Sequence, residues 1–208
     1  MADGLTRLTE VMDRLRSPGG CPWDAEQTHV SLAPYALEET YELIEAIESG
    51  SRADLREELG DVLLQVVFHA RMAQEHPTDP FDIHDVADTI ADKLVERHPH
   101  VFADTPTGTM TDLHQRWDRI KAETTQRESV YDGIPADQPA LARAQKVLSR
   151  TQRAGLTVTD SAGVSIGQQL LALVARAQAE GVDAEQELRE ATRAYEVAAR
   201  EAEGETKR

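Results

Sequence analysis

Cysteine is nearly absent from this chain, because Cys21 is the only one among 208 residues. A single cysteine excludes an intramolecular disulfide and a zinc site built from several thiolates. Aromatic residues are also scarce, at 4%, whereas Ala, Leu, Glu and Arg are abundant. This composition favours helices over strands. We therefore expect an all-α protein of a reducing compartment, the cytoplasm.

Positive charge is scarce as well, since 22 Lys and Arg stand against 38 Asp and Glu, for a formal net charge of −16. A surface of this sign repels phosphate backbones, so nucleic acid is not an expected partner. No apolar run reaches the ~18 residues of a membrane span. The start, Met1 to Gly4, lacks the basic and apolar segments of a signal peptide. We expect neither membrane insertion nor secretion.

Apolar residues recur at helical spacing through most of the chain. The helix predicted over about 83–97 is expected to be capped by Asp82 and buried through Val86, Ile90 and Leu94. Residues 21–31 are predicted to form an ordered loop. The spacing predicts helices over about 3–16, 32–48, 53–74, 83–97, 112–127 and 141–153.

Five acidic residues lie on two consecutive predicted helices: Glu38, Glu39 and Glu42 on the first, Glu58 and Asp61 on the second. Residues three or four apart share a helix face, and the short break between these helices makes them an antiparallel pair. The clustered carboxylates would repel one another, and a divalent cation would remove that cost. All-oxygen ligands favour Mg²⁺ or Mn²⁺ over zinc. Two solvated acidic faces remain the alternative on the pattern alone.

Two further positions on the second of these helices call for an interpretation. Gly60 stands inside the helix, where glycine costs ~1 kcal/mol relative to alanine, and we interpret it as permitting a close approach of another helix. His69 is interpreted as a structural residue.

The motif Glu-Glu-x-x-Glu followed by Glu-x-x-Asp resembles the signature of MazG-type enzymes, which belong to the all-α NTP pyrophosphatase superfamily. Other segments resemble that family too, and the resemblance extends over roughly residues 5 to 155. These other matching segments are Gly20-Cys21-Pro22-Trp23-Asp24, Ala33-Pro34-Tyr35, Arg97-His98-Pro99-His100-Val101-Phe102, Ile134-Pro135 and Pro139-Ala140-Leu141.

The resemblance implies a MazG-like helical bundle that is completed by dimerisation, with a tetramer as the alternative. It implies Mg²⁺-dependent hydrolysis of nucleoside and deoxynucleoside triphosphates to the monophosphate and pyrophosphate. The implied metal ligands are Glu39, Glu42, Glu58 and Asp61. Glu38 would orient or deprotonate the attacking water, or would complete the metal shell.

The resemblance also implies four substrate-binding residues: Lys93, Arg97, Trp117 and Lys121. Members of each pair are four residues apart and so share a helix face, and Trp117 offers a ring on which any base can stack. The alternative function is a catalytically weak nucleotide-binding or scaffold module of the same fold. The motifs do not identify the preferred base.

Three segments are expected along the chain: a catalytic domain over 1–127, a linker with one helix over 128–163, and a truncated, degenerate second repeat over 164–208. Residues 167–174 resemble residues 60–67. The positions equivalent to Glu58 and Asp61 are Ser165 and Gln168, so the second copy is predicted to bind no Mg²⁺.

Overall fold

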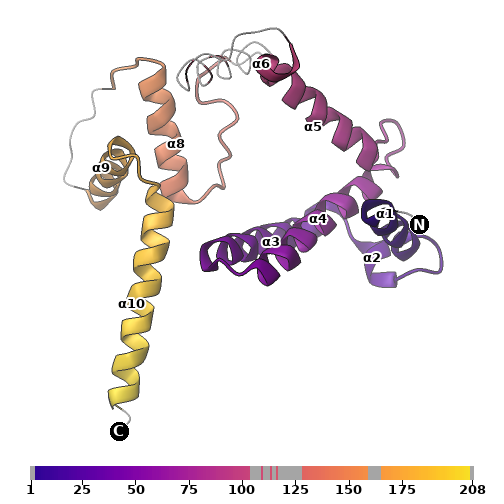
Figure 1. Cartoon of the computed structure of the whole chain (residues 1–208), viewed down its shortest axis with the longest axis horizontal. Helices are drawn as coiled ribbons and strands as arrows, with labels where there is room; N and C mark the ends of the chain where they lie inside the picture. Colours follow the sequence, from indigo (N-terminus) through magenta and orange to yellow (C-terminus); the bar gives the residue numbers. More distant parts are fainter. Residues whose placement is uncertain are drawn as a thin grey trace. The chain divides into compact units, whose positions relative to one another are not determined.

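The computed structural model describes residues 3–103, 109, 113, 116, 128–158 and 165–206. Every regular element in these ranges is a helix and none is a strand, which confirms the all-α prediction (Figure 1). None of the described helices has both the length and the apolar character needed to cross a membrane. The chain divides into two compact units, residues 1–117 and 118–208.

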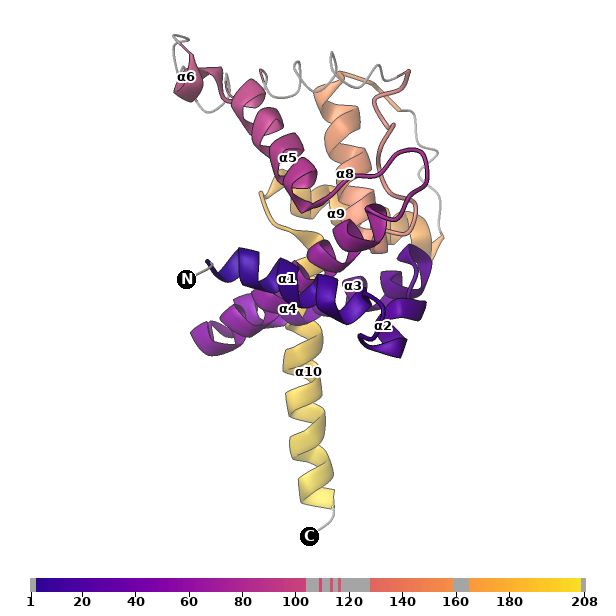
Figure 2. The same ribbon diagram turned by 90° about the vertical axis from the view of Figure 1, so that its right-hand side faces the viewer.

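The first unit is built around an antiparallel hairpin of two long helices, α3 and α4 (Figure 1). Gly50, with a φ of 75°, ends α3, and the Ser51 side chain accepts a hydrogen bond from the Asp54 amide to begin α4. Helix α1 lies across α4 (Figure 2). The described helices of this unit are α1 (Gly4–Arg16), α2 (Pro22–Glu26), α3 (His29–Ser49), α4 (Arg52–Ala73), α5 (Ile83–Arg97) and α6 (Pro99–Phe102).

The core of the first unit lies where α1 and the start of α3 meet the second half of α4. Burial of these apolar side chains is the main favourable contribution to folding here. The fully buried members are Met12, Leu32, Val67, Phe68 and Met72.

The predicted loop over 21–31 is wrong in part, because it contains α2 and the first turn of α3. Helix α3 starts at His29 because Thr28 and Ser31 form a reciprocal capping box: each side chain accepts a hydrogen bond from the other residue's amide. Pro22 occupies the first position of α2, where its missing N–H is not needed.

The predicted burial of Ile90 and Leu94 on α5 is also wrong, since these side chains are 47% and 48% exposed. Helix α5 is capped by Asp82 as predicted. Among the described helices it contacts only α4 and α6, and Figure 1 shows it leading away from the hairpin. The apolar face of α5 is therefore largely uncovered by the described part of the chain.

The second unit contains α8 (Ala140–Arg153), α9 (Ile166–Ala179) and α10 (Ala184–Thr206), and α8 packs against both of the others. Gln145 on α8 connects to the turn before α10: its amide nitrogen donates to the Val182 carbonyl at 2.7 Å, and its oxygen accepts from the Ala184 amide at 2.9 Å. The predicted helix over 141–153 is confirmed. The assignment of 164–208 as a degenerate repeat stays a prediction.

Ser165 and Gln168, the positions predicted to be equivalent to Glu58 and Asp61, form the N-terminal cap of a helix in the second unit. Ser165 is the N-cap of α9, and the Gln168 amide donates to its hydroxyl at 3.2 Å. Glu58, in contrast, lies well inside α4.

Candidate functional site

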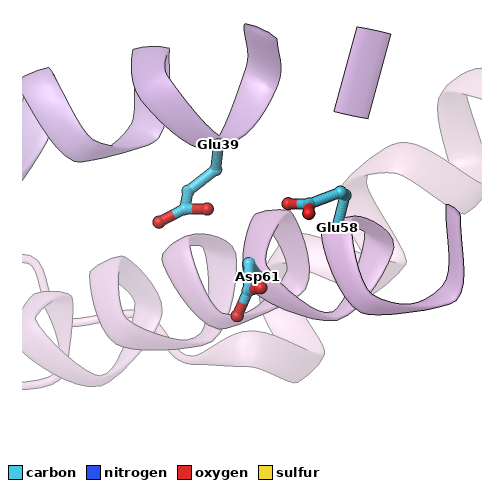
Figure 3. Close-up of side chains that lie close together, drawn as sticks. All are labelled: Glu39, Glu58 and Asp61. Carbon is cyan, nitrogen blue, oxygen red and sulfur yellow. The ribbon is translucent and has the colours of Figure 1, made fainter. Parts of the chain in front are cut away.

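Three carboxylates meet between the two helices of the hairpin. Glu39 extends from α3, and Glu58 and Asp61 extend toward it from α4 (Figure 3). Each residue has one carboxylate oxygen that lies within 4.8 Å of a carboxylate oxygen of both others. The reversal at Gly50 brings the middle of α3 beside the first half of α4, and the spacing of three places Glu58 and Asp61 on one face.

The other two predicted carboxylates differ in their relation to this cluster. Glu42, one turn after Glu39, lies close enough that its charge acts on both Glu39 and Glu58. Glu38 is exposed and is not part of the close group. The structure thus brings together three of the five residues, places a fourth beside them and leaves Glu38 at the surface.

The electrostatics of the cluster are unfavourable to carboxylates without a cation. Loss of solvent raises the pKa of Glu39, and the negative charges of Asp61 and Glu42 raise that pKa further. Loss of solvent also raises the pKa of Glu58, and the negative charges of Glu42 and Asp61 raise that pKa further. Among the described residues no ion pair joins the cluster to a lysine or arginine.

The donor set fits a hard divalent cation. Mg²⁺ and Mn²⁺ prefer carboxylate oxygens, and Mg²⁺ in particular is bound in proteins through a few carboxylates together with substrate phosphates. A cation here would also remove the repulsion that raises the pKa of Glu39 and Glu58.

The predicted substrate-binding residues are not brought to the cluster within the described chain. Lys93 and Arg97 lie in the last two turns of α5, and no Cα atom of α5 comes within 8 Å of one in α3. Lys93 is exposed, whereas the buried Nε of Arg97 has no hydrogen-bond partner. Trp117 and Lys121, and most of the predicted helix over 112–127, lie outside the described residues.

A groove of about 420 Å³ next to the cluster was not anticipated from the sequence. Gln65 and His69 line it from α4, and Thr40 and His29 line it from α3. The sequence does carry a signal for it: Asp61, Gln65 and His69 are spaced by four and therefore follow one helix face. His69, interpreted as structural, is part of the lining.

The chain is similar to known proteins along most of its length. Residues 27–102 match the MazG nucleotide pyrophosphohydrolase domain. The chain is 52% identical over 202 residues to an uncharacterized 26.1 kDa protein of Streptomyces cacaoi, a match that covers 96% of this chain and 83% of that protein.

Two relatives that carry a functional name are longer than this chain. The nucleoside triphosphate pyrophosphohydrolase of Escherichia coli K12 is 48% identical over 159 residues, which cover 74% of this chain and 60% of that protein. That of Mycobacterium tuberculosis is 52% identical over 152 residues, which cover 73% of this chain and 46% of that protein. The chain thus spans about half the length of these two relatives. The matched domain includes all five carboxylates together with Lys93 and Arg97, and the chain belongs to the MazG nucleotide pyrophosphohydrolase family.

Proposed function

We propose that this chain hydrolyses nucleoside and deoxynucleoside triphosphates to the monophosphate and pyrophosphate, with Mg²⁺ as the cofactor and Mn²⁺ as an alternative. The observation that carries the proposal is the group of Glu39, Glu58 and Asp61, whose oxygens lie within 4.8 Å of one another in a domain of this family. Cytoplasmic nucleoside triphosphates are the proposed substrates.

Glu39, Glu42, Glu58 and Asp61 are the proposed metal-holding residues. A bound Mg²⁺ would supply positive charge to the phosphoryl oxygens and to the leaving pyrophosphate. Glu38 adjoins this group on α3 and is exposed, so its carboxylate is the candidate to orient or deprotonate the attacking water, with completion of the metal shell as the alternative role. Most of the rate acceleration would come from positioning and electrostatics.

Positive charge for the phosphates remote from the metal is proposed to come from Lys93, Arg97 and Lys121, with Trp117 stacking on the base. The direction of α5 away from the hairpin supports a homodimer, because a partner subunit is then needed to bring such cations near the carboxylates. A tetramer remains the alternative assembly.

A nucleotide-binding module without turnover is the second candidate function. The retention of all five carboxylates in the first unit favours activity, because binding of a triphosphate alone does not require a complete hard-cation site. The two candidates differ in whether pyrophosphate is released.

The test is pyrophosphate release from a panel of NTPs and dNTPs with Mg²⁺ and with EDTA. Release should require the metal, and Glu39→Gln or Asp61→Asn should lower turnover by at least about 100-fold. Glu45→Gln, an exposed change on the same helix, is the control and should leave turnover unchanged. Near-normal turnover in either site variant, with a helical circular dichroism spectrum, would reject the metal assignment. Tight nucleotide binding without release would establish the binding module.

A further inference from the structure

A hydrogen bond between two histidines joins α3 to α4. His29, the first residue of α3, and His69, in the last two turns of α4, have Nδ1 atoms that are 2.7 Å apart. The ring planes differ by 9°, and the ring centroids are 5.0 Å apart. With this distance between the nitrogens, the centroids can be so far apart only if both nitrogens lie nearly on the line between them. The contact is therefore a linear N–H···N hydrogen bond between two nearly coplanar rings.

This bond lies at the end of the hairpin opposite the turn. The reversal at Gly50 connects the two helices at one end, and the histidines connect them at the other. Glu39 lies midway along α3, between His29 and Ser49. The carboxylates that meet between the helices are thus about 15 Å along α3 from each of the two connections.

A movement of α3 at His29 changes the position of Glu39. A helix of this length is stiff, so when it pivots about the turn, Glu39 moves by about half as far as His29 does. Because Glu58 and Asp61 belong to the other helix, such a movement changes the distances among the oxygens of the cluster. Metal–ligand distances vary by only about ±0.2 Å, so a shift of ~1 Å at the histidines is enough to weaken a metal site.

Apolar packing near the histidines does not replace their hydrogen bond. Leu32, one turn after His29, and Phe68, next to His69, are buried in the core. Burial of apolar surface favours contact but has no direction. A linear hydrogen bond fixes both the distance and the relative rotation of the two side chains.

The hydrogen bond depends on the protonation of the rings. In the neutral pair one Nδ1 donates and the other accepts, and a first added proton leaves the bond in place because an imidazolium can donate to a neutral ring. A second proton gives both Nδ1 atoms a hydrogen, so the bond is lost and two positive rings face each other. Loss of solvent and the charge of His29 lower the pKa of His69, so the second proton binds below the ordinary histidine value.

Few charged groups surround the pair in the described part of the chain. No other residue that lines the groove is charged or titratable. On the other side of His29 the lining includes Arg16, Glu75, His76 and Asp79. Arg16 and Glu75 form an ion pair at 2.8 Å, and the Nδ1 of His76 accepts a hydrogen bond from the Asp79 amide at 3.0 Å. Asp79 is the remaining acidic residue of this lining, so a second positive charge on the pair gains little compensation.

Resting on the proposed metal site, we propose that the His29–His69 hydrogen bond is a positioning device that holds α3 against α4 at the separation a divalent cation requires. Its loss on the second protonation weakens metal binding. The pair acts through the two helices, because it lies two turns of α4 beyond Asp61. Acid therefore weakens the site twice, once at the carboxylates and once at the histidines.

The experiment measures Mn²⁺ binding to the full chain by electron paramagnetic resonance, without substrate, at pH 7.5 and at pH 5.5. His69→Phe keeps a ring and removes the hydrogen bond, so it should bind Mn²⁺ about threefold more weakly than the wild type at pH 7.5. On acidification the wild type should lose at least about threefold more affinity than His69→Phe. Protonation of the carboxylates is common to both proteins and cancels in this comparison.

His69→Asn separates positioning from mere packing. An asparagine amide reaches the position of the histidine Nδ1, can donate or accept, and does not titrate. This variant should have the wild-type Mn²⁺ affinity at pH 7.5 and the smaller pH dependence of His69→Phe. His84→Phe, a change of an exposed histidine on α5, is the control and should match the wild type at both pH values.

A measurement on the wild type alone covers the case in which a variant does not fold. If the second protonation weakens metal binding, the metal must oppose that protonation to the same extent. Saturating Mg²⁺ in 0.15 M salt should lower the pH midpoint of the His69 NMR signal by about 0.5, the equivalent of a threefold change in affinity. The direct effect of the ion's charge is small, because Asp61 and His69 are about 12 Å apart along α4, beyond the Debye length.

The possible failures can be told apart. Equal Mn²⁺ affinities of the wild type and His69→Phe at both pH values, an Asn variant no tighter than the Phe variant, or a His69 midpoint that Mg²⁺ does not move would overturn the proposal. A wild type that binds Mn²⁺ with the expected pH dependence and releases no pyrophosphate supports the positioning role and rejects the proposed function alone. A wild type that binds no Mn²⁺ rejects both.

Discussion

His69 illustrates how one neighbour changes the chemistry of a side chain. Loss of solvent lowers its pKa, and the nearby His29 lowers that pKa further because two charged rings would repel each other. The 2.7 Å contact between the two Nδ1 atoms requires that at least one ring accept a hydrogen bond. On the groove side the named polar neighbours, Thr40 and Gln65, are uncharged. On the other side of His29 the charged or titratable neighbours are Arg16, Glu75, His76 and Asp79.

This lowered pKa predicts a loss of stability in acid. A histidine whose folded pKa lies below its unfolded value of 6.5 binds fewer protons when folded, so its effect on stability is absent above that pH and grows as the pH falls below it. The free energy of unfolding of the wild type, measured by urea denaturation, should fall between pH 7.5 and pH 5.5. His69→Phe should show a smaller fall. An equal fall in both proteins would remove His69 as the cause.

The cluster of three carboxylates was largely predictable from the sequence, whereas the groove beside it was not. Spacing of three on two consecutive helices is enough to place Glu39, Glu58 and Asp61 together once a short turn joins the helices. The unpaired oxygen of Gln65 and the contact of His29 with His69 depend on side-chain placement across the hairpin. Residues 40 positions apart give no such signal in one sequence.

At the scale of single elements, a capping side chain is the feature of the sequence that best predicts where a helix begins. Asp82 precedes α5 and caps it as predicted, because a lone Asp before an apolar-periodic segment is a strong start signal. The capping box of Thr28 with Ser31 starts α3 at His29, inside the segment that was predicted to be a loop. The predicted burial of Ile90 and Leu94 on α5 is wrong because periodicity identifies an apolar face but not what covers that face.

The surroundings of Gly60 contradict the interpretation that this glycine permits the close approach of another helix, and they provide a prediction about α4. A Cβ atom at this position would meet nothing within 4 Å, so glycine is not needed for the approach of another helix within this chain. Gly60→Ala should therefore raise the free energy of unfolding by about 1 kcal/mol through helix propensity alone. Chemical denaturation followed by circular dichroism measures the change.

Gly20→Ala is the matched control for that prediction. A Cβ at Gly20 would overlap the backbone carbonyl oxygens of Arg14 and Leu15, so this variant should be destabilised. If Gly60→Ala is destabilised to a similar extent, a neighbour absent from the single chain packs against Gly60.

On the scale of the whole molecule, the first unit exposes more large apolar side chains than a self-contained domain requires. Leu37 and Ile47 on α3 are 56% and 59% exposed, and Leu59 on α4 is 51% exposed. Extended apolar surface of this kind marks an interface. The two-helix hairpin with an uncovered α5 would form half of a helical bundle that a second copy of the chain completes.

We therefore predict that the chain forms a dimer through these faces. Sedimentation equilibrium should give twice the 23.0 kDa mass of one chain. Ile47→Asp should shift the protein toward the monomer, because it places a charge in apolar surface that the partner covers. Turnover should fall with the dimer fraction, since a single chain leaves Lys93 and Arg97 away from the carboxylates.

Arg52→Asp separates the interface from a general effect of added negative charge. Arg52 is exposed and lies at the first position of α4, across the same turn of the hairpin from Ile47. An aspartate there removes no apolar surface and is favourable at a helix N-terminus, so this variant should stay dimeric and active. A wild-type chain that sediments as a monomer and still releases pyrophosphate at full rate would contradict the dimer. It would require that Lys93 and Arg97 are not needed for turnover, or that α5 folds back onto its own hairpin when the triphosphate binds.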